Sequence, residues 1–82
     1  ELEPHFLEEE TMFAPYWDKI DPALRQRFEG DHAKLRAMMA HPEYMNESWN
    51  KEFAVTLRDH ARFEERELFP AIELFLPLPE NV

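Results

Sequence analysis

The chain has 82 residues, enough for one small domain, and its single glycine among many Leu, Ala, Met, Glu and Arg residues favours helices over sheet. A formal net charge of −9 argues against nucleic acid and anionic membranes as partners, because both bind basic surfaces. The lack of cysteine excludes disulfides, thiolate metal sites and cysteine-held iron–sulfur clusters in this chain. No apolar run of about 18 residues and no signal-peptide pattern is present, so we expect a soluble cytoplasmic protein.

Apolar residues recur at intervals of three and four along three stretches, which is the period of one helix face. The pattern predicts helices at about 1–20, 22–40 and 47–75, followed by an irregular tail at 76–82. Asp21-Pro22 is a helix start, an N-cap residue followed by proline at the first helical position.

Two prolines, Pro15 and Pro70, lie inside apolar patterns that continue beyond them, so each predicts a kink or a helix end. Before the third helix, either Asn46 or Ser48 is suited to be the N-cap. Short connections place neighbouring helices side by side and antiparallel. The sequence therefore predicts that residues 1–82 form a single all-α domain, an up-and-down antiparallel helical bundle.

The first and third helices contain the same spaced set of residue types. Residues 2–15 and 57–70 both carry leucine, histidine, two consecutive glutamates and proline at matching offsets. In the first copy Glu9 follows His5 by four residues, and in the second Glu64 follows His60 by four, so each pair shares one helix face. The middle helix places His32 on its own apolar stripe.

A lone histidine on such a stripe is usually a hydrogen-bonded core residue, and a lone His/Glu pair is usually a surface ion pair. The joint pattern is different, because two carboxylates that face one core repel each other and are costly to bury. A divalent or trivalent metal resolves the conflict, since neutral imidazoles and carboxylates both become ligands and carboxylates can bridge two ions. We therefore predict a metal site with the following ligands: His5, Glu9, His32, His60 and Glu64.

The segments HFLEEE (5–10), GDHAKL (30–35) and HARFEERELFP (60–70) resemble the hemerythrin-like (HHE) domain family over nearly the whole chain. The resemblance implies a four-helix bundle that holds a non-haem di-iron centre. By position, the first of these segments matches the family's second helix, and the other two match its third and fourth helices. In some members the fourth-helix carboxylate follows its histidine by five residues, so Glu65 is an alternative to Glu64, although helical phase places Glu64 closer to the His60 face.

The chain departs from the family pattern in two ways. The family's first helix, which carries a further ligand histidine, is absent here. We expect either that upstream residues supply it or that a second copy of the chain completes the bundle as a homodimer, through the faces that carry Leu2, Phe6, Leu24 and Phe28. Arg36 stands where many oxygen carriers have a second histidine, and arginine cannot ligate a metal because it stays protonated. This argues against plain reversible oxygen carriage.

The residues alone predict metal binding. The resemblance implies a protein that senses, stores or carries iron, dioxygen or nitric oxide, with a metal ion and a small diatomic molecule as its partners. Two alternatives stay open at this stage: a di-iron enzyme that activates oxygen or peroxide, and a metal-free helical module that serves only in assembly.

Overall fold

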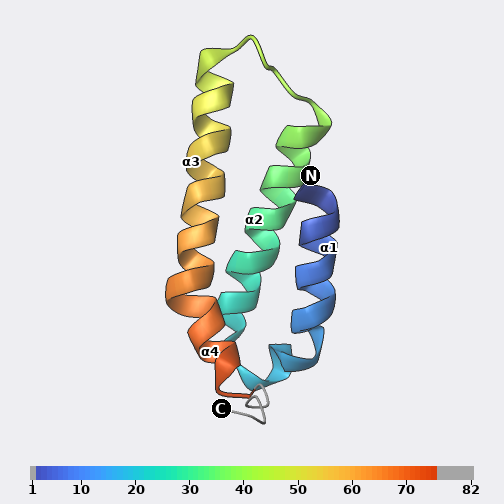
Figure 1. The fold of residues 1–82 in the computed structure, drawn as a ribbon, viewed down its shortest axis with the longest axis vertical. Coiled ribbons are helices and arrows are strands. Elements are labelled where there is room, and N and C mark those ends of the chain that lie inside the picture. The colour runs from blue at the N-terminus through green and yellow to red at the C-terminus, as the bar shows by residue number, and fades with distance from the viewer. Residues whose placement is uncertain (1, 76–82) are drawn as a thin grey trace, which may run out of the picture.

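The computed structural model describes residues 2–75 of the chain, and within that range every regular element is helical (Figure 1). Three long helices form the body. They are α1 (Leu2–Phe13), α2 (Pro22–Ala40) and α3 (Glu47–Phe63). A 3-10 helix, η1 (Ala14–Lys19), joins α1 to α2, and a π-helical turn, η2 (Glu64–Leu68), joins α3 to the short α4 (Phe69–Glu73). The tail predicted at 76–82 lies outside the described residues.

The three long helices run antiparallel in chain order, so the prediction of an all-α up-and-down bundle is confirmed (Figure 1). In the view of Figure 1, α2 lies between α1 and α3. The α2–α3 pair extends beyond the start of α1 at the end where residues 41–46 connect the two helices. The result is an elongated molecule of 49 × 28 × 20 Å.

Side-chain caps fix where two of the helices begin. The Asp21 carboxylate accepts a hydrogen bond from the Ala23 N–H at 2.9 Å, with Pro22 in the first turn of α2. At the start of α3 the cap is Asn46 and not Ser48. Its side-chain oxygen accepts from the backbone N–H groups of Ser48 and Trp49, at 2.9 and 3.2 Å. Caps of this kind stabilise a helix by about 1 kcal/mol each.

The helices predicted at about 1–20 and 47–75 are each divided in the structure. The α-helical geometry of α1 ends at Phe13, and Pro15 lies in η1. In the other segment α3 gives way to η2, where the Phe69 N–H donates to the Glu64 carbonyl, and α4 follows with Pro70 in its first turn. Proline has no N–H to donate and its ring clashes with the preceding turn, which explains both interruptions.

The apolar core lies at the end of the bundle that contains η2 and α4. Five buried side chains form it: Phe13, Phe28, Phe63, Leu68 and Ile72. Burial of each large apolar side chain stabilises the fold by about 1.5–3 kcal/mol. The cluster therefore holds α1, α2 and the C-terminal helical segment together. Among residues 2–75, no helix is long and apolar enough to cross a membrane.

Candidate metal centre

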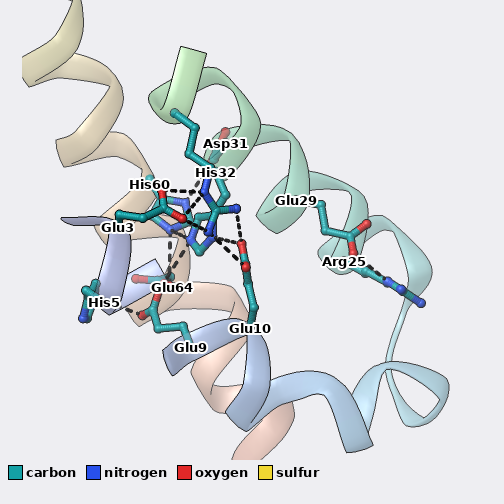
Figure 2. Close-up of polar contacts among 11 residues, drawn as sticks. Glu3, His5, Glu9, Glu10, Arg25, Glu29, Asp31, His32, His60 and Glu64 are labelled. Atoms are coloured by element: carbon teal, nitrogen blue, oxygen red, sulfur yellow. Dashed lines mark hydrogen bonds and ion pairs between the residues drawn. The ribbon is translucent and has the colours of Figure 1, made fainter. Parts of the chain in front are cut away.

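Four buried side chains from different parts of the chain meet just beyond this core. α1 contributes Glu9, α2 contributes His32, α3 contributes His60 and η2 contributes Glu64 (Figure 2). One potential ligand atom from each lies within 4.8 Å of all the others. The four residues are only 1–7% exposed, so the arrangement is interior and not a surface cluster of charges.

The two imidazoles face each other through their Nε2 atoms, which are 3.1 Å apart. Glu9 Oε1 lies 3.4 Å from His32 Nε2, and Glu64 Oε2 lies 3.3 Å from His60 Nε2. Within the described part of the chain, these two carboxylate oxygens are buried and have no hydrogen-bond partner. Buried polar atoms without a partner are rare and costly, and here both point at the same small region.

The opposite nitrogens of the two rings are already engaged. His32 Nδ1–H donates to Glu10 Oε2 at 2.8 Å, and His60 Nδ1–H donates to Asp31 Oδ2 at 2.9 Å. An ionised carboxylate can only accept, so in the neutral imidazoles the proton lies on Nδ1 and the lone pair lies on Nε2. Four lone-pair atoms therefore converge, which is unfavourable unless a cation or protons lie between them.

These donors fit a metal ion. Ligand atoms about 2.1 Å from one ion lie at most roughly 4.2 Å from each other, so a cluster within 4.8 Å needs only small side-chain movements to hold it. The two carboxylates carry two negative charges, which a divalent ion would neutralise.

Aromatic rings enclose the centre. The His32 imidazole lies between Phe6 and Phe28, with ring centroids 4.2 and 4.1 Å away. Both phenylalanines are at most 1% exposed. The rings exclude water from one side of the site and fix the plane of the His32 imidazole.

Glu9 and Glu64 lie close enough together to affect each other's pKa. Burial raises the pKa of Glu64 above its usual value, and the nearby Glu9 adds to the rise while His60 opposes it. Burial also acts to raise the pKa of Glu9, but contacts with His32 and Glu64 and the charge of His5 outweigh it, so this pKa is lowered. Two neighbouring carboxylates with opposite shifts are typical of a pair that shares a proton when no cation is bound.

The fifth predicted ligand, His5, lies at the edge of the cluster. Its side chain is 57% exposed, and its Nε2 is 3.4 Å from Glu9 Oε2. The two oxygens of Glu9 therefore face two different imidazoles, His5 outside and His32 inside (Figure 2). Of the two consecutive glutamates in the second motif, Glu64 is buried at the centre and Glu65 is exposed.

Sequence reasoning missed the two carboxylates that hold the imidazoles, Glu10 and Asp31. Each stands beside a predicted ligand in the chain, and Glu10 is also one of the repeated glutamates, but neither signal assigns it to an imidazole. Asp31 contacts His60 and not its neighbour His32, because consecutive helical residues point about 100° apart. That rotation turns Asp31 toward α3. The orientation of α2 relative to α3 cannot be read from one sequence.

The Arg36 side chain lies outside the centre but is connected to it. Its guanidinium donates to both oxygens of Glu10, at 2.7 and 3.1 Å, and its Nε donates to Glu3 at 2.9 Å. An arginine with these contacts supports α1 and Glu10 and does not act as a ligand.

Comparison with known proteins agrees with this geometry. Searches of curated proteins and of solved structures gave no match. Residues 1–72 match the family model described as the hemerythrin HHE cation binding domain. That match covers most of the chain, and this protein therefore belongs to the hemerythrin HHE cation-binding domain family.

Proposed function

We propose that the chain is a non-haem iron protein of the cytoplasm that senses, stores or carries iron, dioxygen or nitric oxide. The observation that carries the proposal is the convergence of two Nε2 lone pairs and two partnerless carboxylate oxygens in a buried centre. A cation is the simplest occupant that removes the repulsion between them.

The proposed ligands are Glu9, His32, His60 and Glu64 for one ion. His5 Nε2 lies 3.4 Å from the outer oxygen of Glu9, so His5 and Glu9 would contribute to holding a second ion. A set of imidazoles and carboxylates without thiolate suits iron, zinc or manganese. Family membership supports a cation, and the resemblance described above supports iron in particular.

Iron supplies redox chemistry and open coordination positions at which a small diatomic molecule binds. The protein's own residues control access to it. Phe6 and Phe28 keep the inner side dry, while His5 lies on the exposed side, so a small ligand would approach past α1.

An enzyme that activates oxygen or peroxide is a second candidate. It is favoured by Arg36, which stands where oxygen carriers have a histidine and which contacts Glu3 and Glu10 in place of the centre. One protein ligand fewer leaves more room at the metal for a reactant.

Metal analysis of aerobically purified protein with its visible spectrum tests the proposal. Two irons per bundle with oxo-bridge absorption would support the di-iron form. Zinc in the purified protein, or no metal, would contradict the proposal of an iron protein. Titration with oxygen or nitric oxide then separates a carrier or sensor from an enzyme, which would instead turn over peroxide.

Phe6 and Phe28, which were expected in a dimer interface, are at most 1% exposed, so the expected interface is not available. We instead propose that a second copy of the chain covers the apolar surface at Met12 on α1, which is 52% exposed. Together with Phe13, Phe69 and Ile72, Met12 lines an apolar groove of about 240 Å³. Exposed apolar patches of this kind often mark an interface. Light scattering should give a dimer for the parent chain and a monomer for Met12→Lys; a monomeric parent chain would contradict the proposal.

A further inference from the structure

Two equivalent chains of contacts approach the centre from opposite sides. On one side Arg36 binds Glu10, and Glu10 accepts the Nδ1–H of His32. On the other side Arg27 Nε donates to Asp31 Oδ2 at 2.9 Å, and the same oxygen accepts the Nδ1–H of His60. The order is arginine, carboxylate, imidazole in both, although the two carboxylates come from different helices, α1 and α2.

The geometry points to Glu10 and Asp31 as positioning residues that set the tautomer and orientation of the two central imidazoles, with Arg36 and Arg27 holding the carboxylates in place. This inference rests on the proposed function for its effect on metal binding. Its structural part, the tautomer of each imidazole, can be measured without metal.

The physical argument begins with the neutral imidazole, which has one N–H and one lone pair. Free in water, either nitrogen can carry the proton. A carboxylate 2.8–2.9 Å from Nδ1 stabilises the form that donates from Nδ1, and that form presents its Nε2 lone pair to the centre. A ring with the other tautomer would place an N–H where the metal should bind.

The arginines complete the arrangement. A carboxylate beside a metal centre could rotate and become a ligand or take up a proton. Arg36 opposes both at Glu10, because its guanidinium donates hydrogen bonds to both carboxylate oxygens. Arg27 also balances the charge of Asp31, whereas Arg36 is shared between Glu10 and Glu3.

The arginine of the Glu10 chain has an additional role, because it joins α2 to α1. Arg36 on α2 binds Glu3 as well as Glu10, two residues that lie two turns apart on one face of α1. Loss of Arg36 should therefore loosen the part of α1 that carries Glu9. The Asp31 chain lacks this role, because Arg27 and Asp31 lie one turn apart on α2.

The test uses protein with ¹⁵N-labelled histidine and compares Glu10→Leu with Glu10→Gln, whose side-chain oxygen can still accept. The matched control is Glu29→Leu, which removes an exposed glutamate that binds Arg25 on α2 and contacts no imidazole (Figure 2). Long-range ¹H–¹⁵N spectra of the metal-free protein, recorded above the titration of the imidazoles, report which nitrogen of His32 is protonated. Zn²⁺ titration measures affinity.

We expect His32 to be protonated on Nδ1 in the parent chain, in Glu10→Gln and in the control. Glu10→Leu should lose this preference and bind Zn²⁺ about 10–100-fold more weakly, the usual loss when a partner of a metal-binding histidine is removed. An unchanged tautomer in Glu10→Leu would overturn the inference. If the parent chain binds neither Zn²⁺ nor iron, the proposed function fails, and the tautomer still decides whether Glu10 positions His32.

Discussion

The Glu9 carboxylate is a charged group buried at the candidate metal centre. It is 5% exposed, its inner oxygen has no hydrogen-bond partner among the described residues, and the neighbouring Glu64 affects its pKa. In the metal-free protein His5 and His32 offset the cost of burying its charge, and a bound cation would offset it further. Phe28 has the opposite character, since it is fully buried, contacts both central imidazoles and belongs to the apolar core.

Replacement of these two residues should separate metal binding from folding. Glu9→Ala is expected to abolish metal binding and to change the free energy of unfolding of the metal-free protein far less than a core truncation does. The reason is that the cost of burying the carboxylate offsets much of its contacts with His5 and His32. Phe28→Ala should lower the free energy of unfolding by about 3–5 kcal/mol with or without metal. Metal analysis and denaturant unfolding after chelation measure both effects.

The control for Glu9→Ala is Glu8→Ala, which truncates an exposed glutamate on the same helix and should leave metal content intact. Equal destabilisation of the metal-free protein by Glu9→Ala and Phe28→Ala would mean that Glu9 is a structural residue and not a ligand.

At the scale of single elements, the sequence predicted the helices and the candidate ligands but not all of the contacts between helices. Helical periodicity and the cap at Asp21-Pro22 located three helices. The His/Glu spacing, together with the place of His32 on an apolar stripe, selected five candidate ligands, and the structure brings all of them except His5 within 4.8 Å of one another. An interruption near Pro70 was predicted, but its form as a π-helical turn at Glu64–Leu68 was not, because periodicity does not reveal one extra residue in a turn. The contact between Asp31 and His60 was equally hidden, since it depends on how α2 is rotated against α3.

The choice between Asn46 and Ser48 as the cap of α3 was open in the sequence, and it leads to an element-scale prediction. Asn46→Ala should lower the free energy of unfolding by about 1 kcal/mol, because two backbone N–H groups lose their acceptor. Ser48→Ala is the matched control and should change it by a few tenths of that amount. Metal content should be the same in both, and a larger loss from Ser48→Ala would reverse the assignment.

For the whole molecule, the proposed centre adds a link between α1 and the α2–α3 pair, beside the core cluster and the Arg36 contacts. α1 contributes Phe6, Glu9 and Phe13 as its buried residues, and two of these three lie at the centre and not in the main core cluster. A metal bound by Glu9, His32, His60 and Glu64 would thus connect α1 to the α2–α3 pair. Any ligand that binds only the folded state stabilises it in proportion to the logarithm of its concentration.

Metal binding should therefore raise the melting temperature. At a free metal concentration about 100 times Kd the gain is about 2.7 kcal/mol, which for a domain of this size corresponds to roughly 10–20 °C. Thermal melting with and without chelator measures the shift, and Glu9→Ala should show none. Identical melting of chelated and loaded parent protein would contradict the proposed centre.

The extension of the α2–α3 pair beyond α1 has a consequence for motion. Between residues 36 and 59 no side chain is fully buried, whereas buried residues are frequent on both sides of that interval. Hydrogen bonds there are protected only by local helical structure, so their amides should exchange with solvent through fraying and partial opening. The molecule thus has a rigid base, which contains the core and the candidate metal centre, and a more mobile arm, which consists of residues 36–59 of α2, α3 and their connection. Hydrogen–deuterium exchange should find rapid exchange around residues 41–56 and slow exchange around His32 and His60, and metal should slow the base while leaving the arm unchanged.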